Sequence, residues 1–303
     1  MSKYIKDSRT PTQVINDMIS NTYSSNNTLL QHLENNKILS KTMEAFEQKA
    51  QIHNLYKLPR NQNNITEDEA DKLKNIYKNH SSAIANIIFN NQTNDFAKKY
   101  CWQCRLRNIS EYETLDHFLP KNYTDGYPEL SFYPNNLIPT CSACNNGIKG
   151  PDYKDDKLKI LKSYNPYYYD IDSKVILYFY FSYKKGILDF HFYLNRGSIK
   201  NKRLKLSIKK QFSKDGLKLL DRYKEEVESE LDNIVMVFNS DSANAEDIFN
   251  KWLTDQIIHI SNTCGINYWL CAFYRGLLNN HDAFVYFQTR KNELKKKYVM
   301  NVI

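Results

Sequence analysis

The sequence predicts an α+β protein that is mainly helical, with a small central core organised by cysteines and a C-terminal β-hairpin followed by helices. Three observations support this class: amphipathic helix patterns near both ends, two Cys-x-x-Cys pairs in the middle, and two aromatic-rich runs separated by a short glycine-containing turn. We therefore expect a helical region over residues 1–98, a core over 99–170, and a hairpin-plus-helix region over 171–303.

Length and charge narrow the class of protein. The 303 residues can bury a sizeable core without staples, and 41% hydrophobic and 25% charged residues are ordinary globular usage. The net charge of +8 favours polyanionic partners such as nucleic acid. The N-terminus shows no apolar leader and the longest apolar run, Val175 to Phe181, is too short to span a bilayer, so we expect a cytoplasmic protein without membrane contact.

The first region carries helix signals. Thr66-x-x-Glu69 is a capping box, and residues 28–53 and 81–89 show apolar spacings of three and four. Asn61 to Asn64 indicate a loop. We expect these helices to support the core.

The cysteine pairs are the sharpest signal in the middle region. Cys101-x-x-Cys104 and Cys141-x-x-Cys144 offer four thiolates on two tight turns, which is the ligand set of a structural zinc site. Disulfides fit less well because no secretory leader accompanies them, and a redox pair would need only one Cys-x-x-Cys. Cys264 and Cys271 are expected to be buried free thiols in an apolar helix.

Between and beside these pairs lie residues with catalytic chemistry. Asp116-His117 ends a short apolar stretch, Asn136 precedes a second one, and Asn145 directly follows Cys144. This pattern resembles the HNH endonuclease family, whose fold is the ββα-metal motif, over about residues 99–170. The resemblance implies a metal-dependent nuclease core that is stapled by zinc.

The residue types suit that chemistry on their own. Carboxylate and amide oxygens are ligands for Mg²⁺, which binds few protein oxygens and keeps several waters. Neighbouring side chains on a strand point to opposite faces, so Asp116 can address a metal while His117 addresses water. A neutral imidazole can accept a proton from that water at neutral pH.

The resemblance also implies individual roles. His117 would be the general base, Asp116 with Asn145 would hold a catalytic Mg²⁺ or Mn²⁺, and Asn136 would fix the loop and orient the His117 ring. The spacing to the following lysine departs from the family pattern, so Asn146 remains an alternative ligand. Two lysines are expected as phosphate contacts, although each could equally be a solvated surface residue: Lys121 and Lys149.

The last region begins with the hairpin. Lys174 to Tyr183 and Ile187 to Leu194 are the predicted strands, and Lys184-Lys185-Gly186 is the turn between them. Helices are expected over about 214–238, 246–260, 266–278 and 283–298, with a break at Gly265.

A basic segment lies between the hairpin and these helices. It contains Lys202, Arg203 and Lys205 and could follow a phosphate backbone, or it could be an ordinary solvated face.

We therefore expect a metal-dependent HNH endonuclease that acts on DNA, with RNA not excluded, in a bacterial defence or restriction system. Two alternatives stay open: a catalytically inactive, zinc-stabilised nucleic-acid-binding module, and a nuclease subunit that is active only with an ATPase or another protein partner. Double-strand cleavage would suggest a homodimer, because one such core cuts one strand at a time.

Overall fold

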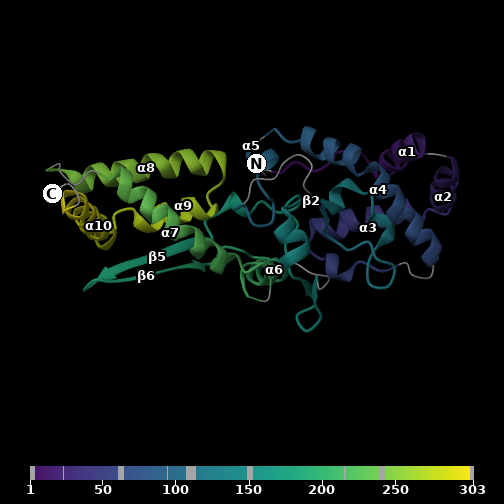
Figure 1. Ribbon diagram of the computed structural model, residues 1–303. Coiled ribbons are helices and arrows are strands. Elements are labelled where there is room, and N and C mark those ends of the chain that lie inside the picture. The colour runs from purple at the N-terminus through teal and green to yellow at the C-terminus, as the bar shows by residue number, and fades with distance from the viewer. Residues whose placement is uncertain are drawn as a thin grey trace. The chain divides into compact units, whose positions relative to one another are not determined.

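The computed structural model describes residues 4–22, 24–60, 65–93, 95–106, 114–148, 153–214, 216–238 and 243–300; for 24–25, 146–148 and 295–300 it describes the backbone alone (Figure 1). The chain divides into two compact units. The first comprises Met1–Asp170, Ile199–Gln211 and Asp215–Leu217, and the second comprises Ile171–Ser198, Phe212–Lys214 and Lys218–Ile303. The N-terminal helices and the cysteine core therefore belong to one unit.

Helices make up the first part of that unit. They are α1 (Pro11–Asn21), α2 (Ser24–Asn35), α3 (Ile38–Gln51), α4 (Glu67–Asn90) and α5 (Asp95–Lys99). The predicted capping box at the start of α4 is confirmed, because the Thr66 hydroxyl accepts from Glu69 N at 3.2 Å and the Glu69 carboxylate accepts from Thr66 N at 2.7 Å. The loop predicted at Asn61 to Asn64 lies outside the described residues.

The cysteine core contains a very short hairpin. Strand β1 (Leu115–His117) pairs antiparallel with β2 (Leu137–Pro139), with His117 opposite Leu137. A π-helical turn, Ala143–Ile148, follows β2. The unit is completed by β3 (Lys154–Asp155), β4 (Ile160–Leu161) and most of α6 (Lys202–Phe212).

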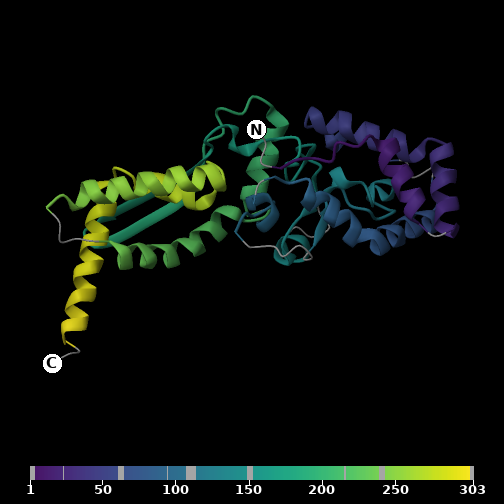
Figure 2. The ribbon, with the colours of Figure 1, turned by 90° about the horizontal axis from the view of Figure 1, so that it is seen from above.

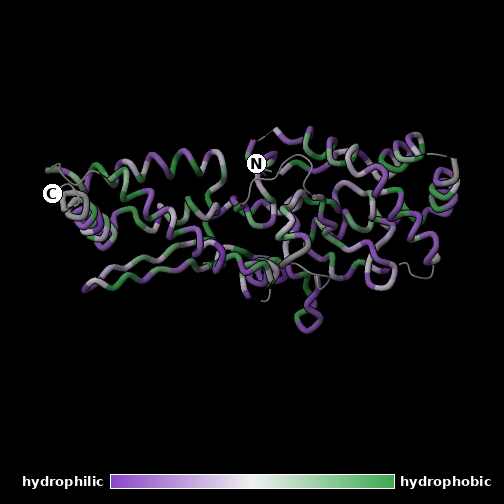
Figure 3. Tube along the Cα trace, viewed as in Figure 1, coloured by the Kyte–Doolittle hydropathy of each residue, from purple (hydrophilic) through white to green (hydrophobic). Residues whose placement is uncertain are grey.

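The second unit is built on the predicted hairpin. Strands β5 (Leu177–Lys184) and β6 (Ile187–Leu194) are joined by Lys185 and Gly186, whose φ angles of 52° and 78° are both positive, as a two-residue type I′ turn requires. Apolar and polar residues alternate along both strands (Figure 3). The apolar positions pack on helices, for example Phe179 on Phe273 with ring centroids 5.0 Å apart.

Four helices complete this unit: α7 (Leu219–Val237), α8 (Ala245–Thr263), α9 (Trp269–Leu277) and α10 (His281–Met300). In Figure 1 the two strands lie on one side of α7 and α9, which contact β6 and β5, with α8 beyond them; Figure 2 shows the same elements from above. The predicted break at Gly265 is confirmed, with φ at +105° between α8 and α9. This break corrects the prediction for the two cysteines outside the cluster, because Cys264 is half-buried at the end of α8 and only Cys271 is buried, in α9.

The predicted class is confirmed: a mainly helical α+β protein with small antiparallel hairpins and a buried four-cysteine cluster. In the part of the chain that the structure describes, no helix combines the length and apolar character needed to cross a membrane.

Candidate functional site

The four cysteines of the two Cys-x-x-Cys pairs form one buried cluster. The sulfurs of Cys101, Cys104, Cys141 and Cys144 all lie within 4.8 Å of one another, and those of Cys104 and Cys141 are 3.9 Å apart. Tetrahedral zinc with Zn–S bonds of about 2.3 Å requires sulfurs about 3.8 Å apart. The cluster therefore could bind a metal such as zinc.

Backbone hydrogen bonds shape the two turns and attach them to β2. Arg105 N donates to Cys101 O at 2.8 Å, and Asn145 N donates to Cys141 O at 3.0 Å, so each pair of sulfurs is held on a tight turn. Trp102 N donates to Pro139 O at 3.1 Å. The cluster thus fastens the end of the β1–β2 hairpin.

His117 is held in one orientation by a backbone carbonyl. Its Nε2 lies 2.8 Å from Ser131 O, and the Tyr77 ring packs edge-on against the imidazole with centroids 4.5 Å apart. A carbonyl oxygen can only accept, so Nε2 carries the proton and Nδ1 carries the lone pair of the neutral ring. This is the tautomer in which Nδ1 can accept a proton.

Asp116 is a buried carboxylate, 6% exposed, beside this imidazole in sequence. Its charge reaches Tyr77, since burial and the nearby Asp116 carboxylate together raise the pKa of Tyr77 to about 12. His117 therefore contacts Tyr77 of α4 through its ring, whereas Asp116 affects the same tyrosine through its charge. Strand alternation directs the Asp116 and His117 side chains to opposite faces of β1.

Asn136 is fully buried and every polar atom of its amide is engaged. Its Oδ1 accepts from Leu119 N at 2.8 Å, and its Nδ2 donates to Leu119 O at 3.0 Å and to Leu130 O at 3.3 Å. Leu119 follows β1, and Leu130 precedes the residue whose carbonyl holds His117. Asn136 therefore positions the segments on both sides of the imidazole.

Asn145 and Lys121 line one cleft of about 500 Å³ together with α4 and the start of β1. The Lys121 Nζ lies 4.1 Å above the Tyr77 ring, and burial together with the charge of Lys74 lowers the pKa of Lys121. Among the described residues, neither Asp116 nor His117 lines this cleft, although the Tyr77 ring that packs against His117 does. The complete lining is Lys74, Asn75, Tyr77, Lys78, Ser81, Ser82, Ala85, Phe89, Thr114, Leu115, Lys121 and Asn145.

The α4 wall of the cleft was not predicted, because α4 was interpreted as support alone. A signal was present: Lys74, Lys78 and Ser81 follow at spacings of four and three, which places them on one helix face.

The other predicted contacts fall elsewhere. Lys202 and Arg203 are exposed on α6 and Lys205 is half-buried there, apart from the cleft. Lys149 and the Asn146 side chain lie outside the described residues, so the choice between Asn145 and Asn146 stays open.

Comparisons with known proteins give short matches. Over 51 residues, 17% of this chain, it is 49% identical to the Septu protein PtuB of Bacillus thuringiensis, covering 18% of that protein. Over 51 residues it is 41% identical to Protein ea31 of Escherichia phage lambda, covering 16% of that protein. The chain thus matches less than a fifth of the length of either relative. No family model matches the chain, and no solved structure matches it significantly.

Proposed function

We propose that the chain is a metal-dependent endonuclease of the HNH type that hydrolyses phosphodiester bonds in DNA. The observation that carries the proposal is the His117 imidazole, whose proton is fixed on Nε2 by Ser131 O and whose sequence neighbour is the buried Asp116 carboxylate.

In this proposal His117 is the general base. Its Nδ1 accepts a proton from the attacking water, and the carbonyl at Nε2 stabilises the imidazolium that results. Proton transfer of this kind contributes about 10²- to 10⁴-fold to the rate. Asn136 keeps the ring in place through Leu119 and the segment before Ser131.

The ligand types of the proposed donors suit a hard divalent cation, although only Asn145 among the described donors lines the cleft. Asp116 would supply a carboxylate oxygen, and Asn145, or Asn146 in the alternative, would supply an amide oxygen, which are ligand types that Mg²⁺ and Mn²⁺ accept. When bound, such an ion stabilises the charge that develops on the phosphate and the leaving oxygen. Zinc in the cysteine cluster would have a structural role.

The cleft suits a polyanionic substrate. Lys74, Lys78 and Lys121 line it, and Lys74 also pairs with Asp71 at 2.7 Å. Lys74 and Lys78 are four residues apart on α4 and can contact phosphates of one nucleic-acid strand. The affinity of the cleft for nucleic acid should then fall as the salt concentration rises.

We place the nuclease in bacterial defence, and the match to the Septu protein PtuB supports this placement. The alternative of a nuclease subunit that is active only with an ATPase or another protein partner stays part of this proposal.

The test is cleavage of supercoiled plasmid with Mg²⁺, with Mn²⁺ and with EDTA. We expect nicking that requires the added ion and falls at least about 100-fold in His117→Ala. His191→Ala, an exposed histidine on β6, is the matched control and should cut like the wild type. A wild-type protein that binds DNA but does not cut it with any divalent ion would favour the alternative, a catalytically inactive nucleic-acid-binding module.

A further inference from the structure

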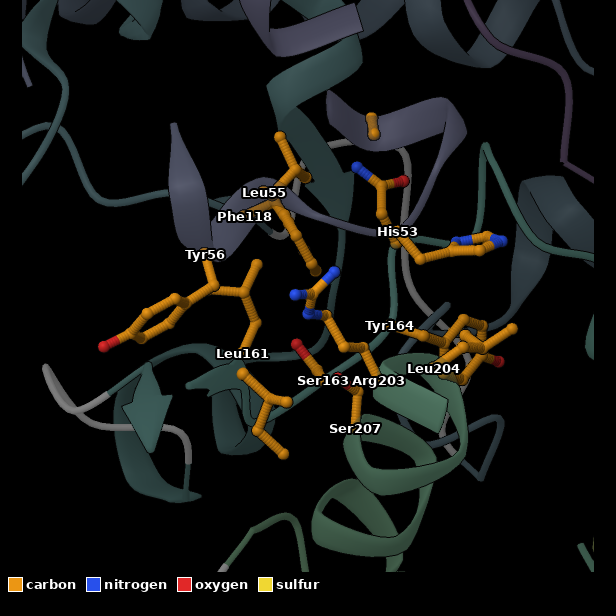
Figure 4. Close-up of a pocket in the computed structure, with 13 residues that line it drawn as sticks. His53, Leu55, Tyr56, Phe118, Leu161, Ser163, Tyr164, Arg203, Leu204 and Ser207 are labelled. Carbon is orange, nitrogen blue, oxygen red and sulfur yellow. The ribbon is translucent and has the colours of Figure 1, made fainter. Parts of the chain in front are cut away.

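A second, smaller pocket lies in the first unit between η1 (Leu55–Lys57), β4 and α6 (Figure 4). Apolar side chains, among them Leu55, Leu161 and Leu204, form much of its wall. Arg203 extends from α6 into the pocket, and Ser163 and Ser207 lie at its base.

Three donors meet in this pocket: the hydroxyls of Ser163 and Ser207 and the guanidinium of Arg203. Ser207 is only 7% exposed, but its oxygen is not among the buried polar atoms of the described residues that lack a partner, so the hydroxyl is open to solvent or a ligand. In the described part of the chain no carboxylate forms an ion pair with Arg203, which is exposed. The three donors are therefore available to a bound anion.

The charge of the pocket is positive. No aspartate or glutamate is among its lining residues in the described chain, and burial lowers the pKa of His53, the other titratable nitrogen there, so this imidazole is neutral at pH 7. Arg203 thus supplies the charge, and a guanidinium with two hydroxyls matches the oxygens of a tetrahedral anion.

We propose that this pocket binds one phosphate group, either of a free nucleotide or of a nucleic-acid backbone. Its accessible space is small, about 30 Å³, and the pocket is open on one side. Only a headgroup therefore enters, and the remainder of the ligand lies outside. The site is distinct from the cleft that contains Lys121 and Asn145, and it does not depend on nuclease activity.

The pocket also adjoins the candidate catalytic strand. Phe118, which directly follows His117, lines it. Phe118 N donates to Asn136 O at 2.7 Å, so a bound phosphate would lie against the same segment that positions the imidazole.

The test is calorimetric titration of the full chain with inorganic phosphate, with AMP and with an unphosphorylated DNA oligonucleotide, in a His117→Ala background that prevents cleavage. We expect Arg203→Gln to weaken phosphate binding at least about tenfold and Ser207→Ala to weaken it several-fold. Lys41→Gln removes an exposed cation on α3 that does not line the pocket, and it should leave phosphate binding unchanged. Circular dichroism checks that each variant is folded.

The probes separate the two sources of phosphate. AMP binding that depends on Arg203, without such dependence for the oligonucleotide, identifies a free nucleotide; Arg203-dependent oligonucleotide binding identifies a nucleic-acid backbone. Absence of saturable binding by all three probes, or equal losses in Arg203→Gln and Lys41→Gln, would overturn the proposal. Because cleavage is not a readout, a failed nuclease assay leaves this result interpretable.

Discussion

Replacing Asn136 by alanine should destabilise the first unit strongly. The substitution removes one acceptor and two donors from a site with no exposed surface, and it leaves Leu119 N, Leu119 O and Leu130 O without their side-chain partner. Each buried polar group left unsatisfied costs about 1–3 kcal/mol. Since three such groups are affected and a small cavity also remains, we expect the free energy of unfolding to fall by at least about 3 kcal/mol.

Urea denaturation followed by circular dichroism measures this loss. The matched control is Asn79→Ala, which changes an exposed asparagine within α4 and should stay within about 0.5 kcal/mol of the wild type. A loss below about 1 kcal/mol in Asn136→Ala would refute the reasoning. Nitrogen NMR of His117 gives a second readout, because the variant should lose the single Nε2-protonated tautomer that Ser131 O selects.

Three further predictions concern metal, acid and backbone. Purified wild type should contain one zinc per chain by mass spectrometry of metals, and Cys104→Ser should lose the zinc and melt at a lower temperature; a zinc-free wild type with an unchanged melting temperature in the variant would contradict this. Burial alone would raise the pKa of Glu47, but hydrogen bonds from a lysine, two tyrosines and an asparagine lower it below its usual 4.5. The stability that the wild type gains over Glu47→Gln should therefore be complete above about pH 5 and shrink as pH falls through the lowered pKa, and a pH-independent difference in urea titrations would speak against it. Gly265→Ala should lower the free energy of unfolding by about 1–3 kcal/mol, because φ is +105° and the added methyl would overlap the Asp172 carboxylate. The control Gly197→Ala, at an exposed glycine, should change it little in the same assay, and equal losses in both variants would exclude strain as the cause.

The features that the sequence predicted well are local ones. The capping box at Thr66, the turn predicted at Lys184-Lys185-Gly186 and the break at Gly265 each depend on a few neighbouring residues, although Lys184 belongs to β5 and the turn itself is Lys185-Gly186. The four-cysteine cluster joins residues that are distant in the sequence, yet the two Cys-x-x-Cys pairs allowed it to be predicted before the fold was known.

The features that were missed depend on tertiary packing. Nothing near Ser131 marks its carbonyl as the acceptor for His117, because any backbone carbonyl can have that role. The cleft along α4 was also not predicted, because Tyr77 and Lys121, which line it, come together only in the folded chain. The second pocket was not predicted either, because Ser163 lies far in sequence from Arg203 and Ser207 and meets them only in the fold.

The candidate site is held by its surroundings rather than by its sheet. Strands β1 and β2 have three residues each, and a two-stranded hairpin of that length is not stable alone in water. Three attachments compensate: the cysteine turn bound to Pro139 through Trp102, the Asn136 amide across Leu119, and the contact of Tyr77 with His117. The Asn136 amide and the Tyr77 ring position the imidazole, and the cysteine turn holds β2, the strand that pairs with β1. Loss of metal from the cysteines should therefore disturb His117 as well as the fold. Zinc removal that lowers the melting temperature but leaves the His117 tautomer unchanged would show that these attachments act independently.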